Sequence, residues 1–147
     1  MIENFEDKFM EAQTALISLC LEVTESKIDK VFAYASIEKR STMFNAFFEK
    51  KGEVLTINQL NIDKRTVMDF LRIGTTDLNK IKKLCEQNET RTPTEIKMYY
   101  DVKSSKFKAD YKYDEICSSK TGVSSGEVFM KWHDELKGEY ENESVNN

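Results

Sequence analysis

The sequence is poor in the residues that most enzymes and metal sites require. It contains one histidine, one proline and three cysteines, and it has neither a CxxC pair nor an HExxH segment. Metal sites are usually built from clustered Cys and His ligands, and a Ser or Cys nucleophile needs a base beside it. We therefore expect no cofactor, no metal site and no enzymatic activity. We interpret Cys20, Cys85 and Cys117 as reduced, mostly buried thiols.

Glycine-rich phosphate loops and long apolar runs are also missing. Neither GxxxxGK nor GxGxxG occurs, which argues against the common nucleotide sites. The longest apolar stretch, residues 15–23, is interrupted by Ser18, Cys20 and Glu22 and is shorter than the ~20 residues that a membrane helix needs. The chain begins with acidic residues, unlike a secretion signal, so we expect a cytoplasmic protein that does not contact a membrane.

The composition that remains is typical of one folded domain. The 147 residues are 39% hydrophobic and 33% charged, with a net charge of −4. A chain of this length buries a single core. The negative charge disfavours nonspecific attraction to nucleic acid and favours a basic partner. We expect one domain over residues 1–140, followed by a disordered, acidic and Asn-rich tail over residues 141–147.

Apolar periodicity predicts two long helices. Apolar residues recur at three- and four-residue steps over residues 5–23 and, after a cap at Asp63, over residues 67–85. Gly74 lies on the apolar face of the second helix, where the missing side chain permits close contact with a sheet. Glycine also weakens a helix, so a break at residues 74–76 is the rival interpretation.

Five short segments rich in β-branched and aromatic residues predict strands. They cover residues 31–37, 42–49, 53–57, 94–102 and 106–113. Gly52 supplies a turn between the second and third segments, and Ser124 caps a third helix that carries Trp132. The order α-β-β-β-α-β-β-α predicts a single-domain α+β fold with an antiparallel sheet of about five strands and helices packed on one of its faces.

One histidine and three acids are the remaining candidates for chemistry. His133 lies on the third helix, and we interpret it as an ordinary surface histidine. Asp110, Asp114 and Glu115 lie within six residues, a spacing that permits Mg²⁺ binding in a nuclease. Asp110 stands among lysines on a strand, however, so charge pairing is the simpler interpretation.

Lysines and tyrosines on the last two strands permit a nucleic-acid surface. They are Lys97, Lys103, Lys106, Lys108 and Lys112 beside Tyr99, Tyr100, Tyr111 and Tyr113. Strand alternation turns most of these tyrosines away from the lysines, and acids interrupt the positive stripe. We therefore expect no direct nucleic-acid binding.

Residues 105–116, with the sequence SKFKADYKYDEI, resemble the C-terminal half of the YezG/EsaG-like bacterial immunity proteins. In that family a Lys-Phe strand leads into a D-Y-x-Y-D pattern, which Asp110, Tyr111, Tyr113 and Asp114 match. A helix that carries a tryptophan follows, as Trp132 does here. Residues 133–138 depart from the Tyr-x-x-Leu-Gly ending that is common in the family.

This resemblance implies a function. Proteins of the family are cytoplasmic antitoxins that bind the toxic C-terminal domain, often a nuclease, of a secreted polymorphic toxin. We therefore expect an immunity protein that neutralises a cognate toxin, with Tyr99, Asp110, Asp114 and Glu115 as its partner-binding residues. The alternatives are a small metal-dependent nucleic-acid-processing enzyme that uses the same acids, a nucleic-acid-binding domain, and a homo-oligomeric scaffold.

Overall fold

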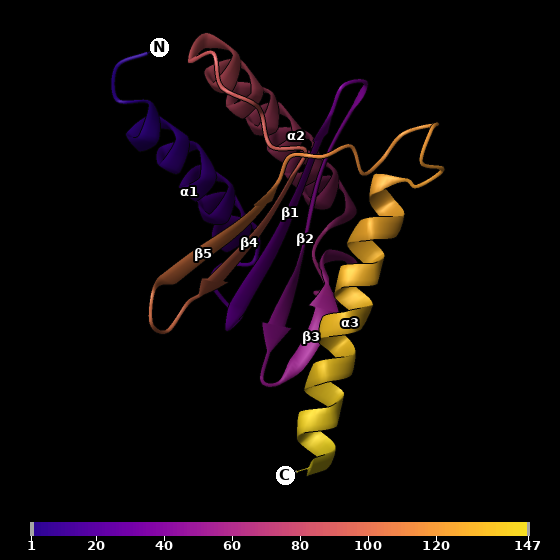
Figure 1. Cartoon of the computed structure of the whole chain (residues 1–147). Helices are drawn as coiled ribbons and strands as arrows, with labels where there is room; N and C mark the ends of the chain where they lie inside the picture. The colour runs from indigo at the N-terminus through magenta and orange to yellow at the C-terminus, as the bar shows by residue number, and fades with distance from the viewer. Residues whose placement is uncertain (1, 147) are drawn as a thin grey trace.

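The molecule is built around one antiparallel sheet (Figure 1). A computed structural model of the chain describes residues 2–146, with side chains as far as residue 143. The elements are α1 (Phe5–Val23), β1 (Lys30–Glu38), β2 (Ser41–Lys50), β3 (Glu53–Thr56), a short 3-10 helix η1 (Ile57–Gln59), α2 (Lys64–Gln87), β4 (Glu95–Asp101), β5 (Lys106–Lys112) and α3 (Ser125–Asn146). The predicted order of helices and strands is confirmed. Within residues 2–146, no helix has both the length and the apolar composition of a membrane-spanning segment.

The strand order across the sheet is β3-β2-β1-β4-β5, and every neighbouring pair is antiparallel. β1 is therefore central, while β3 and β5 form the two edges. The turn between β2 and β3 uses positive φ angles at Lys51 (52°) and Gly52 (82°). The predicted glycine turn is thus present, because glycine adopts this backbone conformation without a steric cost.

α1 and α2 pack side by side on one face of the sheet, where they enclose the larger core (Figure 1). Its helical part includes Leu16, Ile17 and Cys20 of α1 with Phe70, Leu78 and Ile81 of α2. Its sheet part includes Val31, Ala33, Phe44, Phe48, Ile96 and Met98. Both helices therefore bury the apolar stripes that the sequence periodicity predicts.

α2 is one continuous helix, so the rival interpretation of a break at residues 74–76 is wrong. Asp63 caps it, since the backbone N–H of Thr66 donates to the Asp63 carboxylate at 3.3 Å. Gly74 is buried directly against the Phe44 ring of β2, and a Cβ at this position would overlap that ring. The glycine is therefore explained by close packing of the helix on the sheet.

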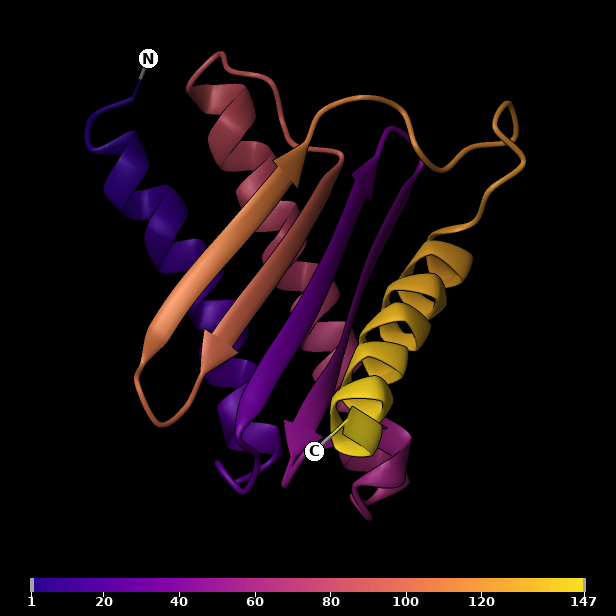
Figure 2. The same ribbon diagram turned by 60° about the horizontal axis from the view of Figure 1, so that its bottom comes forward.

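α3 lies on the opposite face of the sheet, so the expectation that all helices share one face is wrong (Figure 2). There it covers a second core formed by Phe32, Tyr34, Phe47, Val54, Phe129 and Trp132. β1 is the reason for this layering. Residues 31–38 are all buried, and alternate side chains enter the two cores, so the strand needs cover on both sides.

The ends of α3 differ in part from the prediction. At its start, the backbone N–H of Glu127 donates to the Ser124 hydroxyl at 3.2 Å, as expected for a cap. The helix then continues to Asn146, so the predicted disordered tail over residues 141–147 is helical as far as the structure describes it, and residue 147 lies outside the described residues. Tyr140 packs against the second core, and the Lys30 ammonium donates to its hydroxyl at 3.3 Å. These contacts hold the helix against the sheet near its end.

Candidate functional site

One half of the sheet has no helix over it on the α3 side. α3 contacts β2 and β3, and Figure 2 shows β4 and β5 uncovered in the foreground. The register pairs Tyr99 with Lys108 and Lys97 with Asp110, so these side chains share that face. We call this surface the open sheet face. It is formed by Glu95, Lys97, Tyr99 and Asp101 of β4 and by Lys106, Lys108, Asp110 and Lys112 of β5.

Tyr99 is an aromatic anchor at the centre of the open sheet face. Its ring meets the rings of Phe32 and Trp132 edge-on, with centroids 6.1 Å and 5.5 Å apart. The Lys108 ammonium lies 5.1 Å from the Tyr99 ring centroid, within cation–π range. Burial, and then the neighbouring Asp110 carboxylate, raise the pKa of Tyr99 to about 12. The phenol is therefore neutral at physiological pH and held in one place by its neighbours.

Asp110 lies beside Tyr99 on the same face. Its carboxylate is 3.7 Å from the Lys108 ammonium, and both groups are exposed. The charge pairing that the sequence suggests for this acid is therefore present. Of the four predicted partner-binding residues, the structure brings together Tyr99 and Asp110.

Asp114 and Glu115 lie apart from that pair, in the exposed connection that follows β5. The Thr94 hydroxyl donates to the backbone carbonyl of Asp114 at 2.7 Å, and the Asp114 carboxylate forms no ion pair within residues 2–146. Over residues 2–146, no three His, Cys, Asp or Glu side chains are placed to hold a metal ion together. The Mg²⁺ site considered for Asp110, Asp114 and Glu115 thus has no counterpart in this geometry.

A buried carboxylate that the sequence does not single out organises the open sheet face beside α3. Glu95 is 2% exposed, and its carboxylate accepts a hydrogen bond from the Tyr34 hydroxyl at 2.9 Å. The ammonium groups of Lys97 and Lys112 lie 4.0 Å and 3.8 Å from the same carboxylate. Lys97 also lies over the Trp132 ring, 5.3 Å from its centroid. Glu95 therefore pairs with two lysines of the open sheet face, and Lys97 is the more enclosed of the two.

The open sheet face carries mixed charge with a positive excess. β4 and β5 together place four lysines and three carboxylates on this face. A recess of about 370 Å³ opens at one end and is lined in part by Phe32, Tyr99, Asp101, Lys106 and Lys108. Tyr111 points to the other side of the sheet, where its hydroxyl donates to Gln13 of α1 at 2.7 Å. As expected from strand alternation, some tyrosines turn away from the lysines, but Tyr99 does not.

His133 is buried, so its interpretation as a surface histidine is wrong. It is 6% exposed, and its ring stands edge-on to the Phe47 ring at 5.3 Å between centroids. Its Nδ1 lies 2.9 Å from the Asp134 carboxylate, and its Nε2 has no hydrogen-bond partner within residues 2–146. The position follows from the stripe of α3 that packs on the sheet, because residue 133 comes four positions after Phe129.

The three cysteines are buried and unbridged, as expected. Burial raises the pKa of each thiol, most strongly that of Cys20. These groups are therefore protonated and unreactive at neutral pH, and they contribute to packing.

Comparison with known proteins adds no assignment. No family model matches the chain, and no curated protein matches it at a significant level.

Proposed function

We propose that this protein is a cytoplasmic immunity protein that binds and neutralises the toxic domain of a secreted bacterial toxin. The proposal is supported by the resemblance of residues 105–116 and Trp132 to the YezG/EsaG-like family. The observation that carries it is the open sheet face, because most of that segment forms β5, and Trp132 borders the same surface. Of the residues that carry the resemblance, Asp110 lies on this surface and Trp132 borders it, whereas Tyr111 points to the other side of the sheet.

The open sheet face has the properties of a protein-binding surface. Tyr99 supplies an aromatic centre, a residue type that contributes much to many interfaces, and the buried Trp132 ring supports it from the core. Charged groups of both signs surround this centre, and Lys97 is restrained by the Glu95 carboxylate and the Trp132 ring. Fixed side chains lose little entropy when a partner binds, which favours tight association.

Two modes of inhibition are compatible with a nuclease target. In the first, acids of the antitoxin cover the cationic substrate groove of the toxin. Asp114 and Glu115 suit this mode, because they are exposed and form no ion pair within the described residues. In the second, the aromatic centre and lysines of the open sheet face bind beside the groove and distort the active site of the toxin.

Co-expression tests the proposal. The test partner is the C-terminal domain of a large secreted protein whose gene neighbours the gene of this chain. That domain is expressed in a host whose growth it stops. We expect the wild-type chain to restore growth, and we expect Tyr99→Ala to restore it poorly because the aromatic anchor is lost. Failure of the wild-type chain to protect, or the lack of any such neighbouring gene, would remove the proposal.

Association kinetics separate the two modes of inhibition. Reversal of Asp114 and Glu115 to lysine should lower the association rate about tenfold at low ionic strength if charge steers the encounter. The matched control reverses Glu11 and Glu86, two exposed acids on the helices of the opposite face, and changes the net charge equally. An equal rate for both double variants would exclude steering by residues 114–115.

Nucleic-acid binding is the second candidate, favoured by the lysines that surround Tyr99 on the open sheet face. A fluorescent single-stranded oligonucleotide distinguishes the two functions by anisotropy. Binding that weakens with salt and is lost on Tyr99→Ala would support this candidate. No binding near physiological salt is the result that the immunity proposal expects.

A further inference from the structure

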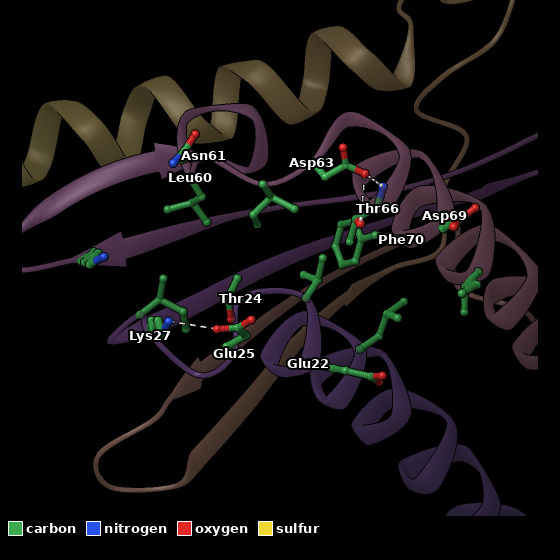
Figure 3. A pocket seen from close by; sticks show the side chains of 16 residues that line it. Glu22, Thr24, Glu25, Lys27, Leu60, Asn61, Asp63, Thr66, Asp69 and Phe70 are labelled. Carbon is green, nitrogen blue, oxygen red and sulfur yellow. Dashed lines mark hydrogen bonds and ion pairs between the residues drawn. The ribbon is translucent and has the colours of Figure 1, made fainter.

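A second hollow lies on the opposite side of the sheet, between the end of α1 and the start of α2. Its volume is about 560 Å³, and we call it the helix groove. Figure 3 shows Glu22, Glu25 and Lys27 along one wall and Leu60, Asp63 and Asp69 along the other. The walls come from residues 19–28 and 60–73, which are distant in the sequence.

The lining of the helix groove is mixed, and seven of its sixteen residues are apolar. Its apolar members are Leu19, Val23, Ile28, Leu60, Ile62, Phe70 and Ile73. Ile73, which lines the groove, is 38% exposed. An exposed apolar side chain at the edge of a partly apolar hollow gives a partner an apolar contact point.

The rim of the helix groove is acidic. Four carboxylates, those of Glu22, Glu25, Asp63 and Asp69, face two ammonium groups, those of Lys27 and Lys50. Glu25 pairs with Lys27 at 2.9 Å, a contact that lowers the pKa of its carboxyl, and Asp69 pairs with Arg72 at 3.5 Å. Glu22 forms no ion pair within residues 2–146. With Arg72 included, the four carboxylates exceed the cations by one charge, and Glu22, unpaired within the described residues, is available to an approaching cation.

The walls of the helix groove are held by local structure. The backbone N–H of Ser26 donates to the Leu21 carbonyl at 2.8 Å, and the Thr24 hydroxyl donates to the Cys20 carbonyl at 2.8 Å. On the other wall, the Asp63 cap fixes the first turn of α2. The hollow is thus formed before any partner arrives, which lowers the cost of binding.

We propose that the helix groove docks a basic amphipathic helix of a partner protein. Apolar side chains of that helix fill the groove, and its Lys or Arg residues reach the acidic rim. The phosphates of nucleic acid and of anionic lipids would meet the same carboxylates and be repelled, which argues against both as occupants. This inference is independent of the proposed function, because it concerns the α1–α2 side of the sheet and does not require a toxin.

A designed peptide tests the inference with the whole protein. The probe is a labelled helical peptide of about 14 residues, roughly four turns, with leucines on one face and lysines on the other. Its control carries glutamates in place of the lysines. We expect saturable binding with one peptide per chain, no binding of the glutamate peptide, and methyl NMR shifts at Leu19, Val23 and Ile73.

Charge-matched variants show whether the site is the helix groove. Glu22→Lys with Asp69→Lys should weaken peptide binding about tenfold, whereas Glu11→Lys with Glu86→Lys should change it less than about twofold. Ile73→Ser changes an exposed position and should weaken binding without a charge change. Equal losses in the two double variants, or shifts confined to other residues, would overturn the inference. A stable homodimer that buries the helix groove would also overturn it.

Discussion

Substitution of Gly74 by alanine should destabilise this protein, although the same change usually strengthens a helix. Alanine in a helix interior is more favourable than glycine by about 1 kcal/mol. At Gly74 the added Cβ would overlap the ring of Phe44. That ring is 2% exposed and packs edge-on against Phe70 at 5.4 Å between centroids, so it has no free space to enter.

The magnitude follows from these opposing effects. Overpacking a core costs about 1–3 kcal/mol, and an overlap with a whole ring belongs at the upper end of that range. After subtraction of the helix gain, Gly74→Ala should lower the free energy of unfolding by roughly 2 kcal/mol. For a chain of this length, the expected fall in Tm is about 4–8 °C.

Gly138 provides the matched control, because it also lies within a helix. A Cβ at Gly138 meets nothing within 4 Å, so Gly138→Ala should raise stability by up to about 1 kcal/mol. Urea denaturation followed by circular dichroism measures both variants. In the double variant with Phe44→Leu, the smaller side chain should recover part of the loss caused by Gly74→Ala. A Gly74→Ala protein as stable as the wild type would refute the close packing of α2 on β2.

Three further predictions concern buried polar groups and thiols. Tyr34→Phe removes the hydroxyl that donates to Glu95 and should lower the free energy of unfolding by about 2 kcal/mol in urea denaturation; an unchanged midpoint would show that the hydrogen bond is absent. The fold raises the pKa of Tyr99 from 10.0 to about 12, so this group stabilises the fold below pH 10 and loses that contribution as the pH rises through 12. Denaturation midpoints measured between these pH values should fall, and less steeply in Tyr99→Phe; identical slopes would contradict the shift. Cys20, Cys85 and Cys117 should resist a thiol reagent until the protein unfolds, whereas rapid labelling of the native chain would contradict their burial.

The helices and strands are predictable from local sequence because their patterns are strong. The stripes of α1 and α2 have the helical period, and β5 alternates between apolar and charged residues. The side of the sheet on which a helix packs is harder to infer, since it depends on contacts between distant segments. A signal for α3 exists nonetheless: residues 31–37 are mostly apolar without alternation, as expected for a strand buried on both faces.

The candidate site is only partly visible in the sequence. Alternation places Asp110 on the same side of β5 as Lys108, but its contact with Tyr99 depends on the register of β4 and β5, which the connection between them sets. Glu95 gives no sequence signal, because its burial results from contacts with Tyr34 and two lysines. The helix groove is likewise invisible, since its walls join only when α1 and α2 pack.

Hydrogen exchange of the complex tests the central claim most directly. The chain is mixed with the toxin domain that the proposed function requires, and its exchange is compared with that of the free chain. We predict slower exchange in β4, β5 and residues 113–116, and loss of this protection in Tyr99→Ala. The absence of a complex, or protection confined to α1 and α2, would contradict binding through the open sheet face.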